Sequence, residues 1–265
     1  MNSTYTRLEN KVILVTGAAT GIGESMARRF VAEGATVMLH DRQADEVRSL
    51  ASELGNGSAF VAGDLEDSQV PAVIIAQTVA QLGRIDGLVN NAAVKTRGGI
   101  EETDEEAFDR TVTVNLKAPF FLIRAAIPHF RKQGGGRILN IGSVNSYCGE
   151  KKQCIYSACK GALMTLTRNL ADAHGPEGIR VNQINPGWTL TENERVLKAT
   201  EGLPADWPSK LPAAYAPGGR LFSPDEVASA AVYFLSDEAE LVNGAVLDLE
   251  QYPMIGRNPL KEIPS

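Results

Sequence analysis

The chain has 265 residues, of which 43% are hydrophobic and 22% are charged, and its formal net charge is −6. This length suits one large α/β domain, and the acidic balance argues against nucleic acid or an anionic membrane as the main partner. The first ten residues are polar and no apolar run reaches membrane-spanning length, so we expect a cytoplasmic protein.

The cysteines and histidines are few and do not have the spacing of metal ligands. Cys148, Cys154 and Cys159 are odd in number and close together in sequence, which favours reduced thiols over a disulfide framework. The three histidines lack the spacing of a ligand pair. We therefore expect free thiols and no metal site.

A glycine-rich turn joins the first expected strand to the first expected helix. Residues 12–15 form a short apolar run typical of a buried parallel strand, and a helical pattern spans 22–33. Between them, Gly17 permits a tight turn, Gly21 lets backbone N–H groups approach a pyrophosphate, and Gly23 lets the helix pack on the strand. This context favours dinucleotide binding over a merely structural turn.

The second expected strand, 36–40, ends at Asp41, which lies 18 positions after Gly23. A carboxylate at this interval is placed to accept a hydrogen bond from a ribose 2′-hydroxyl. It would also repel a 2′-phosphate, which predicts NAD rather than NADP as the cofactor. Arg42, at the same turn, could instead hold that phosphate or stack on adenine.

Helices and strands continue to alternate, with expected elements at 44–54, 58–61, 68–82 and 87–89. Asp64 and Leu65 follow the third strand, on the side of the sheet where a ligand crevice is expected. Asp64 therefore either contacts adenine or begins the next helix. The fourth strand is followed by Asn90-Asn91-Ala92-Ala93, whose small residues leave room for a cofactor beside the backbone.

Two polar residues of the next segment stand at positions suited to a site. Asn115 lies between helical patterns at 104–110 and 117–133, where its amide could hold a water or a backbone carbonyl. Ser143 follows the fifth expected strand, 137–141, on the ligand side of such a sheet. Without the tyrosine that comes 13 positions later, Ser143 would be interpreted as a plain turn residue.

That tyrosine, Tyr156, stands four positions before Lys160, at the start of a helical pattern over 157–174. Residues at this spacing lie on one helix face, one turn apart. An ammonium near a phenol favours the phenolate and lowers its pKa from about 10. The pair therefore predicts a phenol that exchanges a proton with an alcohol or a carbonyl oxygen.

The last third of the chain contains a sixth strand at 180–184, a helix at 224–235 and a seventh strand at 245–249. Residues 189–219 show no periodicity that lasts beyond two turns, which predicts a substrate lid. The alternation as a whole predicts a single doubly wound α/β domain over residues 1–250 with a parallel sheet. Residues 251–265 form a tail that either frays or docks on a neighbouring subunit.

The combined motifs resemble the short-chain dehydrogenase/reductase family, in its shorter branch, from Lys11 to about Leu249. They are Thr16-Gly17-x-x-x-Gly21-x-Gly23, Asn90-Asn91-Ala92, Asn115, Ser143, Tyr156-x-x-x-Lys160 and Pro186-Gly187. The resemblance implies a Rossmann-type domain with a seven-stranded sheet, hydride transfer to or from a nicotinamide, and usually a homotetramer. The sequence departs from the family at Ala93, where glycine is usual, and at Asp248-Leu249-Glu250, where Asp-Gly-Gly is usual.

The same resemblance assigns roles to individual residues. Tyr156 would be the catalytic acid/base and Ser143 the partner of the substrate oxygen. Lys160 would bind the nicotinamide ribose and lower the tyrosine pKa, and Asn115 would hold a relay water. The cofactor is expected to be bound by Gly17, Thr20, Gly21, Ile22, Gly23, Asp41, Arg42, Asp64, Leu65, Asn91, Ala92, Tyr156, Lys160, Pro186, Gly187, Thr189 and Thr191.

The substrate is expected to contact Lys95, Arg97, Ser143, Asn145, Gln153 and Trp188. Lys95 and Arg97 on one loop, with Lys151 and Lys152 on another, suggest an anionic sugar such as a uronate, a sulfonated sugar or a sugar phosphate. Alternatively, the lysines at 151 and 152 are solvated and Arg97 pairs with Glu101 or Glu102.

Three classes of function follow from the sequence. The first is an NAD-dependent dehydrogenase that oxidises a hydroxyl group of a sugar or polyol. The second is a carbonyl or ketoacyl reductase of the same family, which a preference for NADP would favour. The third, a non-catalytic dinucleotide sensor, has no reason to keep Ser143, Tyr156, Lys160 and Asn115 together.

Overall fold

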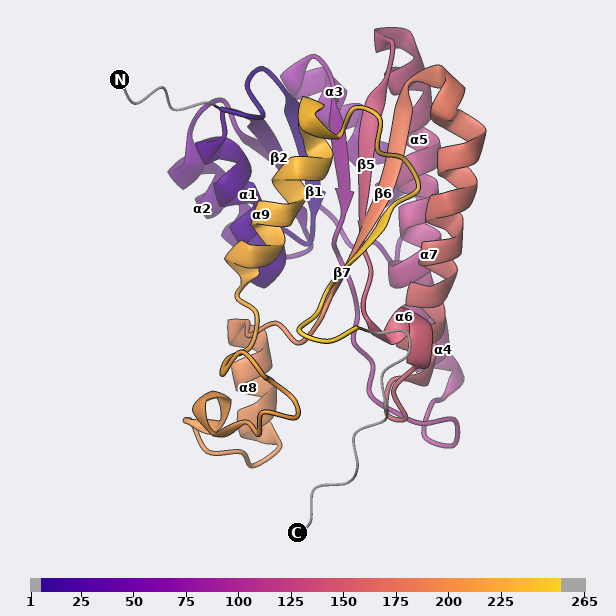
Figure 1. The fold of residues 1–265 in the computed structure, drawn as a ribbon. Helices are drawn as coiled ribbons and strands as arrows, with labels where there is room; N and C mark the ends of the chain where they lie inside the picture. Colours follow the sequence, from indigo (N-terminus) through magenta and orange to yellow (C-terminus); the bar gives the residue numbers. More distant parts are fainter. Residues whose placement is uncertain (1–5, 254–265) are drawn as a thin grey trace, which may run out of the picture.

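Seven parallel strands form the centre of the molecule, in the order β3-β2-β1-β4-β5-β6-β7 (Figure 1). The structure, a computed structural model, describes residues 6–253. Its strands are β1 (Val12–Thr16), β2 (Thr36–Asp41), β3 (Ala59–Ala62), β4 (Gly87–Asn90), β5 (Gly136–Ile141), β6 (Ile179–Pro186) and β7 (Val246–Leu249). The predicted fold class, a doubly wound domain with a seven-stranded parallel sheet, is confirmed.

Helices cover both faces of the sheet (Figure 1). One face carries α1 (Gly21–Ala32), α2 (Ala44–Leu54) and α9 (Pro224–Leu235), and the other carries α3 (Val70–Leu82), α5 (Ala118–Gln133) and α7 (Cys154–His174). Along β1, Ile13 and Val15 join the first core while Leu14 joins the second, because successive side chains of a strand alternate between faces. No helix within residues 6–253 combines the length and apolar character needed to cross a membrane.

The helices that carry predicted site residues differ from the sequence prediction at their ends. The two helical patterns around Asn115 form one continuous run, in which a π-helical turn, η1 (Thr113–Lys117), joins α4 (Glu105–Val112) to α5. Helix α7 begins at Cys154 rather than at residue 157, so the tyrosine and the lysine of the predicted pair both lie inside it. Such π turns are frequent at functional sites.

The predicted lid, residues 189–219, contains regular structure that the sequence analysis did not find. Helix α8 (Glu192–Thr200) and the 3₁₀ helix η3 (Trp207–Lys210) lie beyond one end of the sheet (Figure 1). The lid has its own small core, formed by Trp188, Leu190, Trp207, Leu211, Ala216 and Leu221. Only Glu194 is buried in α8, so this short helix lacks the apolar stripe by which a helix is detected.

The chain after β7 runs along the lid. The Gln251 side chain accepts a hydrogen bond from the Gly218 N–H at 2.7 Å and donates one to the Arg220 carbonyl oxygen at 2.8 Å. The Tyr252 hydroxyl donates to the Ala213 carbonyl oxygen at 2.6 Å. Residues 254–265 of the predicted tail lie outside the described residues, and the described part contacts the lid.

Glu33, at the end of α1, connects the N-terminal segment to the first helix. Its carboxylate accepts a hydrogen bond from Arg7 at 2.6 Å and one from Arg29 at 2.9 Å. The hydrogen bond from Arg7 is the main reason that the pKa of Glu33 falls from its ordinary value of 4.5 to about 2. A carboxyl group with a depressed pKa stabilises the fold in its ionised form, and this contribution is lost as it becomes protonated.

We predict that Glu33→Gln lowers the free energy of unfolding at pH 7 by about 1.5–3 kcal/mol, the range for hydrogen bonds to charged groups. The deficit relative to wild type should be complete above pH 4.5 and should shrink as the pH falls toward 2. Urea unfolding at several pH values measures it, with the exposed Glu46→Gln as the control. A deficit that does not change with pH would contradict this account.

Candidate active site and dinucleotide groove

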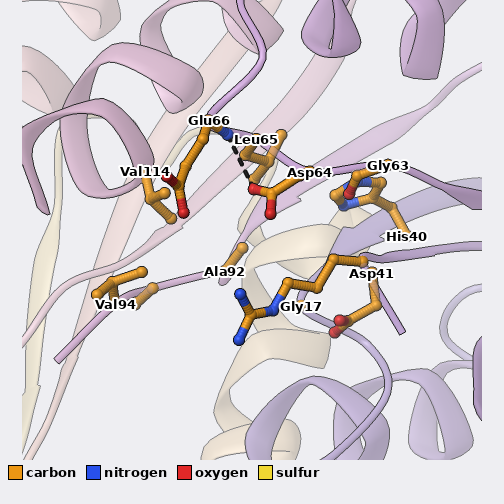
Figure 2. A pocket seen from close by; sticks show the side chains of 12 residues that line it. Gly17, His40, Asp41, Gly63, Asp64, Leu65, Glu66, Ala92, Val94 and Val114 are labelled. Carbon is orange, nitrogen blue, oxygen red and sulfur yellow. Dashed lines mark hydrogen bonds between the residues drawn. The ribbon is translucent and has the colours of Figure 1, made fainter. Parts of the chain in front are cut away.

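A pocket at the carboxyl ends of β2 and β3 gathers several residues that the sequence predicted for the cofactor. It is lined by Gly17, His40, Asp41, Arg42, Gly63, Asp64, Leu65, Glu66, Ala92, Ala93, Val94 and Val114. Figure 2 shows Asp41 beside Gly17, and Asp64 bound to the backbone of Glu66. The structure thus brings Asp41, Arg42, Asp64 and Leu65 into one pocket, which fits the predicted adenosine end of a dinucleotide.

Asp41 is fixed by two backbone N–H groups. One carboxylate oxygen accepts a hydrogen bond from the Ala19 N–H in the glycine-rich turn, and the other accepts one from the Gln43 N–H, both at 3.2 Å. An ionised carboxylate has about four acceptor positions, so it keeps the capacity to accept a hydrogen bond from a ribose hydroxyl. His40, just before it, is buried, and burial lowers its pKa to about 4, which keeps it neutral.

The glycine-rich turn is too tightly packed for side chains at two positions. Gly17 has a φ of +66°, and a Cβ there would lie 2.8 Å from the Ala92 Cα, while a Cβ at Gly23 would overlap the Gly17 carbonyl oxygen. Asn91 holds the turn from the side, because its amide donates to the carbonyl oxygens of Thr16 and Gly17 at 3.0 Å. The packing of the turn therefore requires glycine at both positions, as expected for a strand–turn–helix unit of this kind.

A second crevice, of about 440 Å³, continues from this turn to the predicted catalytic residues. The predicted cofactor and catalytic residues along it are Gly17, Thr20, Gly21, Ile22, Asp41, Asn91, Ala92, Ser143, Tyr156, Lys160, Pro186, Gly187, Thr189 and Thr191. Its volume is within the range of small-molecule sites. One continuous groove thus joins the predicted dinucleotide site to the Ser143, Tyr156 and Lys160 side chains.

The three predicted catalytic side chains in this crevice are almost fully buried. Ser143 follows β5, and Tyr156 and Lys160 lie on α7, with exposed fractions of 9%, 6% and 2%. Ser143 is the hydrogen-bond partner of the Tyr156 hydroxyl. The Lys160 ammonium donates to the Ile141 carbonyl oxygen at 2.7 Å and lies 5.6 Å from the Tyr156 ring centre.

The pKa of Tyr156 is raised, not lowered as the spacing to Lys160 predicted. Burial raises the pKa of Tyr156 to about 12, and the hydrogen bond with Ser143 opposes this rise only in part. Burial also lowers the pKa of Lys160 to about 8, and the nearby charge of Lys95 adds to this shift. The spacing in sequence predicted that Tyr156 and Lys160 lie close together, but it did not predict the desolvation that accompanies their burial.

Asn115 is completely buried in the π-helical turn and binds the backbone of the loop that follows β4. Its carbonyl oxygen accepts a hydrogen bond from the Val94 N–H, and its amide donates to the Val94 carbonyl oxygen, both at 2.8 Å. This matches the predicted contact with a backbone carbonyl. One N–H and one oxygen lone pair remain for the predicted water.

A network of buried polar side chains is hydrogen-bonded to the backbone of Ser143. The Ser143 N–H donates to the Asn185 side-chain oxygen at 3.1 Å, and the Asn185 amide donates to Asp248 of β7 at 2.9 Å. Gln183 donates to the same Asn185 oxygen at 2.7 Å. The network then continues through Thr167, Asn140 and Asn90, from β6 across α7 and β5 to β4. Buried networks of this kind restrict side chains to one arrangement.

The predicted substrate residues divide into two groups. Lys95, Ser143 and Trp188 line the crevice, whereas Arg97, Asn145 and Gln153 are not among its described lining residues. Asn145 begins the short helix α6 (Asn145–Cys148) and faces a separate hollow near the cysteines. Gln153 precedes α7, and its backbone pairs with Gly98. Asn145 and Gln153 are therefore close to Ser143 and Tyr156 in sequence but do not line the crevice.

The basic residues expected to attract an anionic substrate face carboxylates of the lid. The Lys95 ammonium lies 3.6 Å from Glu194, and Arg97 forms an ion pair with Glu201. The alternative expectation for Arg97, a pair with Glu101 or Glu102, was wrong, because its partner is Glu201. A hydrogen bond from Lys198 at 2.8 Å is the main cause of the lowered pKa of Glu201, and the charges of Arg97 and Lys152 add to it. Lys151 and Lys152 are exposed.

Sequence reasoning missed three residues of α8 that line the crevice, Asn193, Glu194 and Leu197. The Asn193 amide donates to the Thr20 hydroxyl at 3.1 Å, which connects the lid to the glycine-rich turn. Glu194 accepts a hydrogen bond from the Trp188 indole N–H at 3.0 Å. The Thr191-x-x-Glu194 spacing is a helix-start signal and could have revealed α8, but not the burial of its glutamate.

Comparison with known proteins identifies the family. The sequence model of a family described as enoyl-(acyl carrier protein) reductase matches residues 17–250. The meso-2,3-butanediol dehydrogenase of Serratia marcescens is 36% identical over 245 residues, which cover 92% of this chain and 94% of the relative. The protein therefore belongs to the short-chain dehydrogenase/reductase family and is an oxidoreductase acting on CH–OH groups.

Two solved structures share the fold at similar identity. One, from Beutenbergia cavernae, is described as an NAD(P)-dependent gluconate 5-dehydrogenase with bound NADP. It is 34% identical to this chain with a TM-score of 0.82, and the match covers 93% of this chain and 97% of that one. The other is the 3-ketoacyl-(acyl-carrier-protein) reductase of Brucella melitensis with NADH, 33% identical with a TM-score of 0.83, covering 92% and 98%. The three relatives thus act on different classes of substrate.

Proposed function

We propose that the protein oxidises a hydroxyl group of a neutral sugar or polyol, with NAD as the hydride acceptor. The observation that carries this proposal is the continuous groove that joins the turn at Gly17, beside Asp41, to the buried Ser143, Tyr156 and Lys160. Relatives that bind NADP or NADH support a nicotinamide dinucleotide in that groove.

The residues of the crevice divide the proton chemistry among them. The Ser143 hydroxyl donates a hydrogen bond to the substrate oxygen, and Tyr156, as the phenolate, takes the proton of the substrate hydroxyl as general base. Lys160 uses one of its three N–H donors on the Ile141 carbonyl oxygen, so two remain for a ribose hydroxyl. The bound oxidised nicotinamide supplies a hydride acceptor and a positive charge, which favours the phenolate form of the buried tyrosine.

Asp41 supports NAD over NADP. Its carboxylate lies at the end of β2 and lines both the adenosine pocket and the crevice. A 2′-phosphate at the ribose would lie against this negative charge, whereas a 2′-hydroxyl can donate a hydrogen bond to it. Arg42 lines the same pocket and is the residue that would compensate if the carboxylate were removed.

The substrate is either an anionic sugar or a neutral sugar or polyol. An anionic sugar is supported by the relative described as a gluconate 5-dehydrogenase and by the basic residues on two loops. However, Lys95 faces Glu194 and Arg97 pairs with Glu201, which offsets these charges, so we favour a neutral substrate. The alternative of a carbonyl or ketoacyl reductase is supported by the Brucella relative.

A substrate screen tests this function directly. We expect NAD reduction with meso-2,3-butanediol, D-threitol or D-galactose, weaker reduction with the anionic D-galacturonate, and little NADPH oxidation with acetoacetyl-CoA. A higher kcat/KM for D-galacturonate than for D-galactose would favour the anionic substrate. NADPH-dependent reduction of acetoacetyl-CoA as the main activity would favour the reductase.

We predict that Tyr156→Phe removes more than nine-tenths of the turnover and leaves NAD binding nearly intact, because general acid/base groups contribute about 10²–10⁴-fold. Steady-state rates and a fluorescence titration with NADH measure the two effects. The same loss of a hydroxyl at the half-exposed Tyr233→Phe is the control. Retention of more than about a tenth of the wild-type rate in Tyr156→Phe would exclude a general acid/base role.

We predict that Asp41→Ala raises the ratio of kcat/KM for NADP to kcat/KM for NAD by about 10- to 100-fold, because it removes a like charge from the 2′-phosphate. Asp64→Ala is a matched control that removes a charge from the same pocket, and it should change the ratio much less. Adding Arg42→Ala to Asp41→Ala should reverse part of the gain. An unchanged ratio in Asp41→Ala would mean that this carboxylate does not contact the ribose.

We also propose that the protein forms a homotetramer, with one of its interfaces on a face made of α5, α7 and the π-helical turn. An apolar groove on this face is lined by Val112, Leu116, Lys117, Phe120, Phe121, Ala162, Thr165, Leu166 and Asn169. Phe120 is 45% exposed there, which is costly for a large aromatic side chain unless another surface covers it. A second copy can cover it, because the same face is present on every subunit.

We predict that Phe120→Asp dissociates the assembly into smaller species in sedimentation velocity. Val73→Asp, on α3 and 44% exposed, is the matched control and should keep the wild-type assembly. A wild-type protein that sediments as a monomer, or a Phe120→Asp variant that sediments like wild type, would contradict the proposed interface.

A further inference from the structure

We propose that Glu194 and Lys95 bind a second hydroxyl group of the substrate, so that the enzyme selects polyhydroxylated molecules over simple alcohols. This inference rests on the proposed function, because it concerns the same crevice and the same reaction. It assigns to this pair the part of the site that distinguishes one alcohol from another, while Ser143 and Tyr156 act on the hydroxyl that is oxidised.

The burial of Glu194 is the first argument. The residue is 7% exposed, and a carboxylate removed from water is costly unless hydrogen bonds or a counter-charge compensate it. One oxygen accepts the Trp188 indole N–H at 3.0 Å. The other lies 3.6 Å from the Lys95 ammonium, which is close enough for an ion pair but too long for a hydrogen bond. Hydrogen-bonding capacity therefore remains on both members of the pair, and both line the crevice.

Glu226 occupies the same position in a second copy of the Ser/Thr-x-x-Glu motif, and its side chain makes a capping contact that Glu194 lacks. In Ser223-x-x-Glu226, at the start of α9, the glutamate side chain turns back and accepts the Ser223 N–H, which completes a capping box. In Thr191-x-x-Glu194, at the start of α8, only the first half is present, in which the Thr191 hydroxyl accepts the Glu194 N–H at 3.1 Å. The Glu194 carboxylate leaves the capping position and points to Trp188 and Lys95.

The position of the pair relative to the reaction is the next argument. Glu194 and Lys95 line the same crevice as Ser143 and Tyr156. The charge of Lys95 is close enough to Lys160 to contribute to the lowering of its pKa. A substrate held at Tyr156 therefore has the part of the crevice lined by Lys95 and Glu194 within the same cavity.

The pair is also held in place before a substrate arrives. The Trp188 ring stacks on Trp207 in the small core of the lid, with ring centres 5.3 Å apart and 23° between the planes. The Lys198 ammonium lies 5.5 Å from the centre of the Trp188 ring. Because Trp188 is fixed by these contacts, its N–H fixes the carboxylate of Glu194, and a preorganised partner costs less to bind than a mobile one.

The chemistry of a carboxylate beside an ammonium suits a neutral hydroxyl group. A hydroxyl can donate a hydrogen bond to Glu194 and accept one from Lys95 at the same time. A carboxylate or phosphate group in that place would face the negative charge of Glu194, and a methyl group would leave the remaining hydrogen-bonding capacity of Glu194 and Lys95 unused. Sites built to hydrogen-bond a hydroxyl reject analogues that lack it far more strongly than apolar pockets reject a missing methylene.

The test uses four-carbon alcohols that differ in their number of hydroxyl groups: 2-butanol, meso-2,3-butanediol and D-threitol. For wild type we expect kcat/KM to be higher for at least one polyol than for 2-butanol. In Glu194→Gln, which keeps an oxygen for the Trp188 N–H but removes the charge, the ratio of kcat/KM for that polyol to kcat/KM for 2-butanol should fall about 10- to 100-fold, the range for a charged hydrogen bond. The loss should appear mainly as a higher KM, because the second hydroxyl does not react.

Glu226→Gln is the matched control, since it changes the glutamate of the complete capping box outside the crevice, and the ratio should stay within twofold of wild type. A Glu194→Gln ratio within twofold of wild type, with both alcohols still oxidised, overturns the inference while the proposed function stands. If wild type oxidises none of the three alcohols, nor D-galactose, with NAD, the proposed function fails and this inference fails with it.

Discussion

The hydrogen bond from the buried Lys160 ammonium to the Ile141 carbonyl oxygen joins the two elements on which the site depends. Ile141 ends β5 and Lys160 lies on α7, so this contact sets the distance between Ser143 on one element and Tyr156 on the other. A buried ammonium is costly unless it is hydrogen-bonded, and the buried Ile141 carbonyl at the strand end supplies an acceptor. The buried polar network then fixes the backbone of Ser143 through the Asn185 side chain.

The parts of the site that belong to the sheet could be predicted from the sequence. Short apolar runs such as 12–15 mark buried parallel strands, and the carboxyl ends of such strands meet at one edge, so Asp41 and Ser143 had to converge there. The roles of Gly17 in a tight turn and of Gly23 in close packing were also predicted from the strand–turn–helix pattern, and neither position has room for a side chain. These arguments need only local pattern and topology.

The other parts of the site depend on contacts between residues far apart in sequence, which a local sequence pattern cannot predict. Arg97 pairs with Glu201, more than one hundred positions away, and Glu194 is buried by a lid whose core is assembled from scattered aromatic and apolar residues. The direction of the Tyr156 pKa shift was missed for a similar reason. Spacing on a helix reports that a lysine is near, but desolvation depends on everything packed around the phenol, and here it is the larger effect.

The residues proposed for catalysis and the residues proposed for substrate recognition lie on different parts of the molecule. The residues proposed for catalysis lie on α7, at the end of β5 and in the helical run that includes the π turn, all packed into the main cores. The lid instead reaches the body through polar contacts, including Asn193 to Thr20, Lys95 to Glu194 and Gln251 to the backbone at Gly218. Polar contacts of this kind can be exchanged without disturbing either core, and loops on a rigid scaffold commonly carry recognition. Substrate choice can therefore change through the lid while the proton chemistry stays on the body.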